Sequence, residues 1–148
     1  MFFHNLTNEC VTKRVINATV AGQTDITSAA IDTLGYAGFR VVALAGTITD
    51  TSVSYVKVQD CDTSGGSYND VAGSKQSFQT TGDSNNMIIL DILKPTKRFI
   101  KVIFSRATAN CVIDGVLVEL YHADYGAPSK DTTVSAQKIL VAPIDGTA

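Results

Sequence analysis

The stretch DCDTSGGSYND (60–70) comes closest to a metal site in its residue types and spacing. The first, third, fifth and sixth places of an EF-hand-like calcium loop are matched by Asp60, Asp62, Ser64 and Gly65. A true EF-hand loop lies between helices and ends in a bidentate Glu, but here the flanks have strand character and the twelfth place is Val71. We therefore interpret 60–70 as a hairpin connection, in which Gly permits positive φ and Asp and Ser side chains bond nearby amides.

Residue types used in catalysis are present but form no recognisable set. His4 and His122 are the only histidines, and His122 is expected to end a strand beside Asp124. No Gly-x-Ser-x-Gly turn presents a nucleophile, and no glycine-rich phosphate loop precedes a helix. Asp91 and Glu119 lie in expected strands, where we expect them to face solvent or a subunit contact rather than a glycosidic bond. The sequence therefore predicts no enzyme activity, no cofactor and no metal.

The charge and length of the chain limit its partners. It has 148 residues and a net charge of −2, which favours one domain and argues against nucleic-acid binding through phosphate contacts. The basic cluster of Lys94, Lys97 and Arg98 is interpreted as the solvated end of a strand rather than an anion site. The longest apolar runs are far shorter than the roughly 20 residues of a membrane span, so we expect no membrane partner.

Cysteine usage indicates the redox compartment. Cys10, Cys61 and Cys111 are odd in number and show no short C-x-x-C spacing, which argues against a disulfide framework or a zinc knuckle. The N-terminal residues also lack the basic start and long apolar run of a signal peptide. We expect reduced thiols in a protein made in a cytoplasm, with Cys10 and Cys111 semi-buried and Cys61 near a loop.

Short β-branched and aromatic runs separated by Gly, Asn, Asp and Ser predict an all-β chain. Strands are expected at 11–20 (with a weaker helical alternative), within 25–35, and at 38–46, 53–60, 75–80, 87–93, 98–105 and 111–121. Their spacing near ten residues favours an antiparallel β-sandwich, jelly-roll-like, with an extended C-terminal arm. We divide the chain into an N-terminal extension (1–10), a sandwich domain (11–124) and the arm (125–148).

Two sets of apolar residues are candidates for subunit contacts. If Ile100, Val102 and Phe104 face the core, strand alternation places Phe99 and Ile103 on the outer face. By the same alternation, Leu117 and Tyr121 point outward from the 111–121 strand. These side chains either mark an interface or are covered within a sandwich of unequal layers. The second set is the isolated segment KILVAP, with Lys138, Ile139, Leu140, Val141 and Pro143, which either adds a strand to its own sheet or pairs with a neighbouring subunit.

The sequence also resembles a known group of proteins. The first shared features are Ile31-Asp32 before Gly35-Tyr36 and the strand from Phe39 to Gly46. The next are Val56-Lys57-Val58-Gln59, which leads to the 60–70 loop, and the ending at 68–73. KRFIKVIFS and the strand beginning Gly115-Val116 extend the likeness over residues 11–122. In these features the chain resembles the head decoration, or cement, proteins of tailed bacteriophages.

This resemblance implies a non-enzymatic, jelly-roll-like virion protein. Such a protein would form homo-oligomers, dimers or trimers, that bridge and stabilise neighbouring major capsid proteins. It would reside on the capsid surface of the virion, and in the host cytoplasm during assembly. Repetition over a symmetric shell would make modest contacts strong in sum.

Other functions stay open for the same fold class. One is a carbohydrate-binding β-sandwich module of a tail or fibre, although the chain has no Trp and only 7% aromatic residues for stacking on sugars. Another is a tail-tube or head-completion subunit. A small hydrolase would need a nucleophile–base pair, and we find none.

Overall fold

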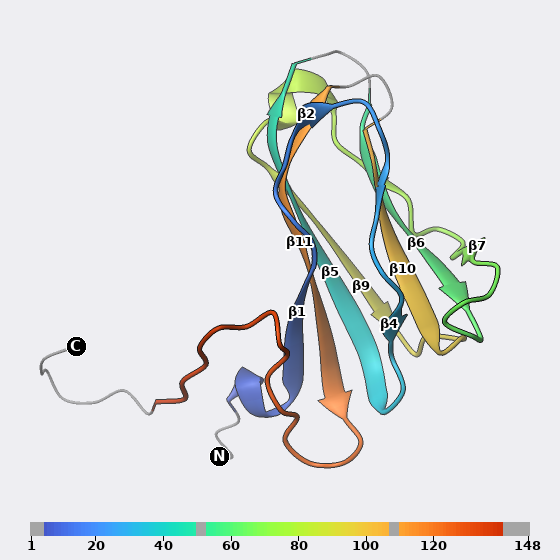
Figure 1. The fold of residues 1–148 in the computed structure, drawn as a ribbon, viewed down its shortest axis with the longest axis vertical. Coiled ribbons are helices and arrows are strands. Elements are labelled where there is room, and N and C mark those ends of the chain that lie inside the picture. Colours follow the sequence, from blue (N-terminus) through green and yellow to red (C-terminus); the bar gives the residue numbers. More distant parts are fainter. Residues whose placement is uncertain (1–4, 50–52, 107–109, 141–148) are drawn as a thin grey trace, which may run out of the picture.

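The computed structural model describes residues 5–49, 53–106 and 110–140, and it consists of two antiparallel sheets packed face to face (Figure 1). Sheet A has the strand order β1-β11-β5-β9, and β2 also pairs with β11. Its strands are β1 (Cys10–Ile16), β2 (Thr19–Gly22), β5 (Tyr36–Ile48), β9 (Met87–Leu93) and β11 (Cys111–Ala123). The predicted all-β sandwich is therefore confirmed.

Sheet B is built around two long neighbours, β6 (Tyr55–Cys61) and β10 (Phe99–Ser105). Two-residue strands flank them: β3 (Ile26–Thr27) and β4 (Ile31–Asp32) pair with β10, and β7 (Asn69–Asp70) and β8 (Gln76–Ser77) pair with β6. The helices among the described residues are the 3₁₀ turns η1 (Leu6–Asn8) and η2 (Thr80–Asp83). None in this part of the chain is long and apolar enough to cross a membrane.

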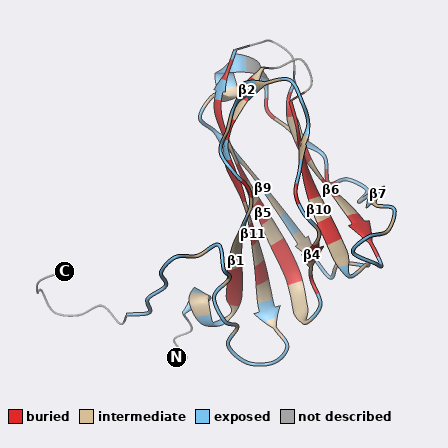
Figure 2. Cartoon of the chain, viewed as in Figure 1, coloured by how far each residue is buried: buried red, intermediate tan, exposed pale blue. Residues whose placement is uncertain are grey.

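The core lies between the sheets and follows from strand alternation (Figure 2). The predicted inward row of Ile100, Val102 and Phe104 on β10 is confirmed, and the alternating rows Val56 and Val58 on β6 and Val116, Val118 and Leu120 on β11 are buried in the same way. On β9 the inward residues Ile88, Leu90 and Ile92 are half-buried and pack against the core at its edge. The residues that alternate with these inward rows therefore point to the outer face of their sheet.

The structure refines the predicted strand boundaries. The 87–93 strand is confirmed, whereas 11–20 divides into β1 and β2 after a register shift between Arg14 and Ile16, and its helical alternative is wrong. The strand predicted at 38–46 extends to Tyr36–Ile48, because it pairs along the length of β11. Region 75–80 contains only the two residues of β8 before η2 begins.

The stretch 60–70 is a hairpin connection, as predicted, but neither Gly65 nor Gly66 adopts the positive φ that we expected of its glycines. β7 turns back onto β6, pairing Asp70 with Gln59 and Asn69 with Asp60. The buried Asp60 carboxylate binds Lys97 at 3.1 Å and accepts from Thr96 at 3.2 Å, whereas Asp70 faces the other way and binds Lys57. No group of three metal-ligating side chains occurs among the residues that the structure describes.

The described C-terminal residues 124–140 contain no strand. They first run beside β1, where Asp131 forms a 3.4 Å ion pair with Lys13, and the Arg14 amide donates to Thr133 Oγ1 at 3.0 Å. Beyond these contacts Lys138, Ile139 and Leu140 are exposed and make no pairing with either sheet. The other two residues predicted to make contacts, Val141 and Pro143, lie outside the described residues.

Candidate interaction surface

The outer face of sheet A gathers an ordered polar cluster beside an apolar patch. We call this surface the sheet A face, formed by Arg40, Asp91, Glu119 and Tyr121 on its polar side and by Val42, Leu44, Met87, Ile89 and Leu117 on its apolar side. Strand register brings them together, because β5 lies between β11 and β9. Arg40 stands opposite both Glu119 and Asp91, and Val42 opposite both Leu117 and Ile89.

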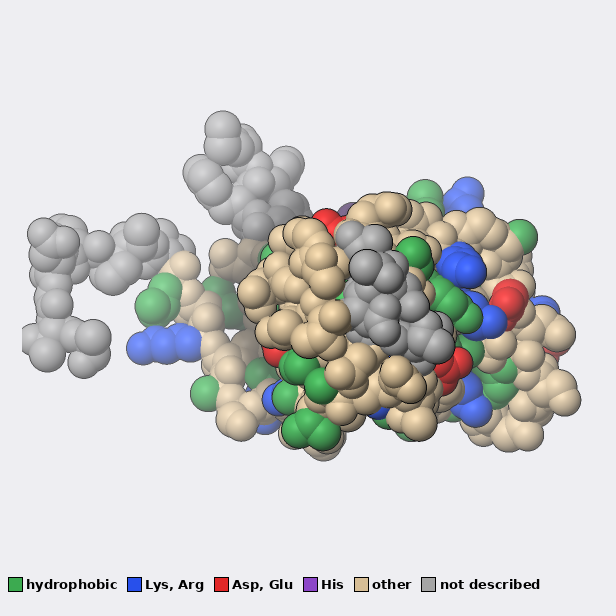
Figure 3. All heavy atoms as spheres, turned by 90° about the horizontal axis from the view of Figure 1, so that it is seen from above, with side chains coloured by type: hydrophobic (Ala, Val, Ile, Leu, Met, Phe, Trp, Pro, Cys, Tyr) green, Lys and Arg blue, Asp and Glu red, His purple; other side chains and the backbone are tan. Residues whose placement is uncertain are grey.

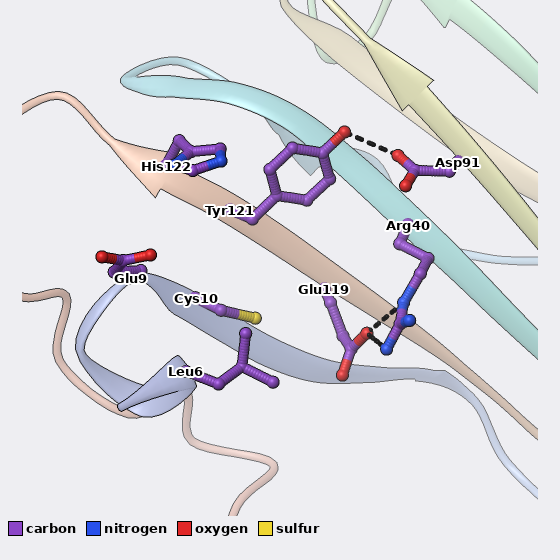
Figure 4. A pocket seen from close by; sticks show the side chains of 8 residues that line it. All are labelled: Leu6, Glu9, Cys10, Arg40, Asp91, Glu119, Tyr121 and His122. Atoms are coloured by element: carbon purple, nitrogen blue, oxygen red, sulfur yellow. Dashed lines mark hydrogen bonds and ion pairs between the residues drawn. The ribbon is translucent and has the colours of Figure 1, made fainter. Parts of the chain in front are cut away.

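The polar side is held by two charge-assisted contacts. The Arg40 guanidinium donates from Nε to Glu119 Oε2 at 2.6 Å and approaches the same oxygen through Nη2 at 2.5 Å. The Tyr121 hydroxyl donates to Asp91 Oδ1 at 2.6 Å, and so reaches across β5 from β11 to β9 (Figure 4). Gly38 makes this crossing possible, because a β-carbon at that position would overlap the Tyr121 ring.

A shallow pocket of about 250 Å³ opens over the cluster (Figure 4). Its remaining walls come from Leu6, Glu9, Cys10 and His122. Burial, followed by the nearby Glu119 carboxylate, raises the pKa of the Cys10 thiol, which disfavours a nucleophilic thiolate. The Asp91 and Glu119 carboxylates each accept a hydrogen bond from within the cluster. The arrangement thus offers a fixed set of donors and acceptors for a polar partner.

Alkaline titration tests the geometry of Tyr121. Burial, then the hydrogen bond to Asp91 and its charge, raise the pKa of Tyr121 to about 12 from 10.0. The neutral phenol is favoured in the folded protein, so its stabilisation is complete below pH 10 and is lost as the pH rises through about 12. A spectroscopic titration of phenolate should show a late transition that Tyr121→Phe removes and Asp91→Asn moves to lower pH. A Tyr121 midpoint near 10 would contradict the structure.

The apolar side of the sheet A face is accessible to solvent. Met87 is 56% exposed and Ile89 is 53% exposed, while Val42, Leu44 and Leu117 are half-buried between neighbouring strands. Leu93, at the far end of β9, is 61% exposed. Contiguous exposed apolar surface on a protein usually marks a contact with a partner. Arg and Tyr, which dominate many interface hot spots, border it here as Arg40 and Tyr121.

The outer face of sheet B has a different character. Lys57 binds Asp70 at 2.8 Å, and Lys101 and Lys75 lie 4.3 and 4.0 Å from the ring centres of Tyr68 and Tyr55. Seen along the long axis, charged side chains gather on the side of sheet B (Figure 3). This face is therefore polar, with many of its charges already engaged.

The four outward residues predicted from alternation lie on opposite sides of the molecule. Leu117 and Tyr121 belong to the sheet A face, whereas Phe99 and Ile103 belong to the outer face of sheet B. Ile103 is only 8% exposed, between Thr27 and Lys57, and Phe99 is half-buried beneath the Arg98 guanidinium. A single partner surface can therefore contact only one of these two pairs.

The other singled-out residues have structural surroundings. Cys61 lies where β6 meets the 60–70 connection, as predicted, but Cys10 and Cys111 are more buried than expected, and all three thiols are free. In the basic cluster, Lys97 pairs with Asp60 and Arg98 with Asp32, which ties the β9–β10 turn to sheet B.

Of the two histidines, only His122 lies among the described residues. His122 is exposed, and its ring lies edge-on to the Tyr121 ring, with 5.5 Å between the two ring centres. His4 lies outside the described residues.

Sequence reasoning did not identify Arg40, Val42, Leu44, Met87 and Ile89 as surface contacts. Alternation in 38–46 and 87–93 carries part of that signal, because the residues that alternate with the core rows include Val42 and Leu44 on the first strand and Met87, Ile89 and Leu93 on the second. The alternation pattern does not show which strands lie next to each other in a sheet. No family model matches the chain, and no curated protein matches it.

Proposed function

We propose that this protein is a virion structural subunit, a capsid decoration or cement protein that docks on the major capsid protein through the sheet A face. The observation that carries the proposal is the accessible apolar patch of Val42, Leu44, Met87, Ile89 and Leu117 on an otherwise well-packed sandwich. The resemblance over residues 11–122 supplies the capsid as partner.

The contact follows from the two sides of the face. The apolar patch would lose water on docking, at roughly 25 cal/mol per Å² of apolar surface buried. Arg40 and Tyr121 would fix orientation at its border, because their own partners already hold them in place. Sheet B, with its paired charges, would face solvent and keep the particle soluble.

The jelly-roll-like topology and the extended C-terminal arm belong to the same proposal. Support for the arm comes from the contacts of Asp131 and Thr133 with β1, which start the segment at the edge of sheet A. Ile139, which is 43% exposed, and Leu140 follow this segment, and neither pairs with a described strand of sheet A or sheet B. The arm would then contact a neighbouring subunit or the shell beside the docked face.

A capsid-binding assay tests the docking face. Leu117→Glu should weaken binding to mature capsids of the phage that carries the protein about tenfold, because a charge would replace apolar surface at the centre of the contact. Leu34→Glu is the matched control, since Leu34 is exposed but lies in the turn before β5. Both variants should show wild-type circular dichroism. Equal binding by Leu117→Glu and wild type would contradict docking through this face.

A second candidate, a carbohydrate-binding module of a tail or fibre, is favoured by the pocket beside Tyr121. The pocket is open to solvent and is lined by the Tyr121 ring, the Arg40 guanidinium and two carboxylates, all of which are groups that contact sugars. A glycan array with the wild-type chain separates the candidates. Reproducible sugar binding without capsid binding would favour the module.

A further inference from the structure

The exposed edges of the two sheets are unequal. The outer strands of sheet B, β3, β4, β7 and β8, have only two residues each, which offers little for another strand to pair with. In sheet A the β1 edge is partly capped, because the Arg14 amide donates to Thr133 in the C-terminal segment. The seven-residue β9 pairs with β5 alone among the described strands. β9 is thus the long open edge of this part of the chain.

Hydrogen bonds at the two ends of β9 show which backbone groups face that edge. Ala45 donates to the Asn86 carbonyl at 3.0 Å, and Lys94 donates to the Ala37 carbonyl at 2.8 Å. The register between them has no shift, so the even-numbered residues of β9 bond to β5. The amides and carbonyls of the odd-numbered residues, from Met87 to Leu93, therefore point away from β5 and are available to a further strand.

We propose that two copies of this chain pair through their β9 edges, antiparallel, with Leu90 opposite Leu90 of the second copy. This register places Met87 opposite Leu93 and Ile89 opposite Asp91, so all four outward-bonding residues find partners. Apolar side chains then meet on the inner face, where Ile88 stands opposite Ile92. The inference does not rest on the proposed function.

Charge and strand length together select this register over its neighbours. Asp91 is the only charged residue in β9, and a register centred on it would place two carboxylates directly opposite each other. Centring on Ile89 would avoid that clash but would leave Leu93 facing residues beyond the end of the strand. Centring on Leu90 sets each Asp91 beside Ile89 and uses the whole strand.

Two hollows beside β9 fit the second copy. One, of about 400 Å³, is lined by Ser77, Phe78, Met87 and Ile88 among others, and the other, of about 220 Å³, includes Val71 and Ile92. In the proposed register, Ile92 of the second copy lies beside the first hollow and its Ile88 beside the second. The same pair of contacts recurs on both sides of a two-fold axis, as a symmetric dimer requires.

Sedimentation and disulfide trapping test the pairing in the full chain. The wild type should sediment as a concentration-dependent dimer. Ile89→Pro should sediment as a monomer with little loss of thermal stability, because it removes an amide that faces the open edge and not one bonded to β5. Under mild oxidation Leu90→Cys should form a covalent dimer, since opposite residues of a non-hydrogen-bonded pair lie about 4.5 Å apart between Cα atoms.

The register has its own control. Ile88→Cys and Ile92→Cys should cross-link poorly alone but form a mixed dimer when combined, because these positions stand opposite each other only in the proposed register. A wild type that stays monomeric at every concentration overturns the proposal, whether or not the cysteine variants fold. So does a dimer that persists in Ile89→Pro, or cross-linking that is equal at positions 88, 90 and 92.

Discussion

Replacing Arg106 by leucine is expected to lower the free energy of unfolding by at least about 3 kcal/mol, the largest effect that we expect from a single polar residue. Arg106 is only 3% exposed and follows β10. Its guanidinium donates to the carbonyls of Thr24, Val20 and Cys111 at 2.8, 2.7 and 3.2 Å, and to the Thr24 hydroxyl at 2.9 Å. Leucine would leave these acceptors without their donor.

The loss should be cooperative because Arg106 connects both sheets. It links the end of β10 in sheet B to β2 and β11 in sheet A, and Gly22 leaves room for it, since a β-carbon there would lie 3.0 Å from Nη2. Arg14→Leu is the matched control, an exposed arginine whose loss should change stability by less than about 0.5 kcal/mol. Chemical denaturation measures both. A loss below about 1 kcal/mol for Arg106→Leu would contradict its structural role.

Phe104→Ala is expected to destabilise the protein by about 3–5 kcal/mol through the cavity that it leaves. Phe104 is fully buried on β10 and stacks on Phe78, with ring centres 5.7 Å apart. Phe78 is itself anchored by its amide, which donates to the Ser54 carbonyl at 2.9 Å. The pair joins sheet B to the segment after β8, so truncation would remove packing from both.

Thermal unfolding provides the measurement for Phe104→Ala, with an expected fall in Tm of about 10 °C or more. Phe104→Leu is the control, because it keeps most of the apolar volume and should cost clearly less. Val20→Ala, at an 82% exposed position, should leave Tm nearly unchanged. If Phe104→Ala unfolded at the wild-type temperature, the stacked pair could not be part of a tightly packed core.

The local features of the fold could be predicted because each depends on neighbouring residues. Alternation located β9 at 87–93 and the inward row of Ile100, Val102 and Phe104. The missing twelfth-place Glu and the Gly-rich composition identified 60–70 as a hairpin connection. In each case the pattern repeats within a few residues, which is the distance over which a strand or a turn is determined.

The candidate surface could not be assembled from the sequence because it depends on strand neighbours far apart in the chain. Tyr121 and Asp91 meet only because β5 lies between β11 and β9 with Gly38 beneath the ring. Arg106 gave no signal, since it follows a strand as a single polar residue. Phe99 and Leu117 looked equivalent by alternation, but placing them on opposite faces required knowledge of which sheet each strand joins.

The proposed docking face and the proposed β9 pairing would reinforce each other. Edge pairing would extend sheet A across two copies and place two apolar patches on one continuous surface. Binding at the first patch would raise the effective concentration of the second at the shell. Leu117 lies on β11, separated from the β9 edge by β5, so Leu117→Glu changes the docking face and leaves the edge intact, whereas Ile89→Pro changes a residue that belongs to both.

Electron microscopy of intact particles can show whether the protein docks on a virion shell. We expect density for this sandwich on the outer surface of the capsid, with Val42, Ile89 and Leu117 against the major capsid protein and sheet B toward solvent. Particles whose shell lacks this density, or carries it with the sheet A face open to solvent, would contradict this expectation.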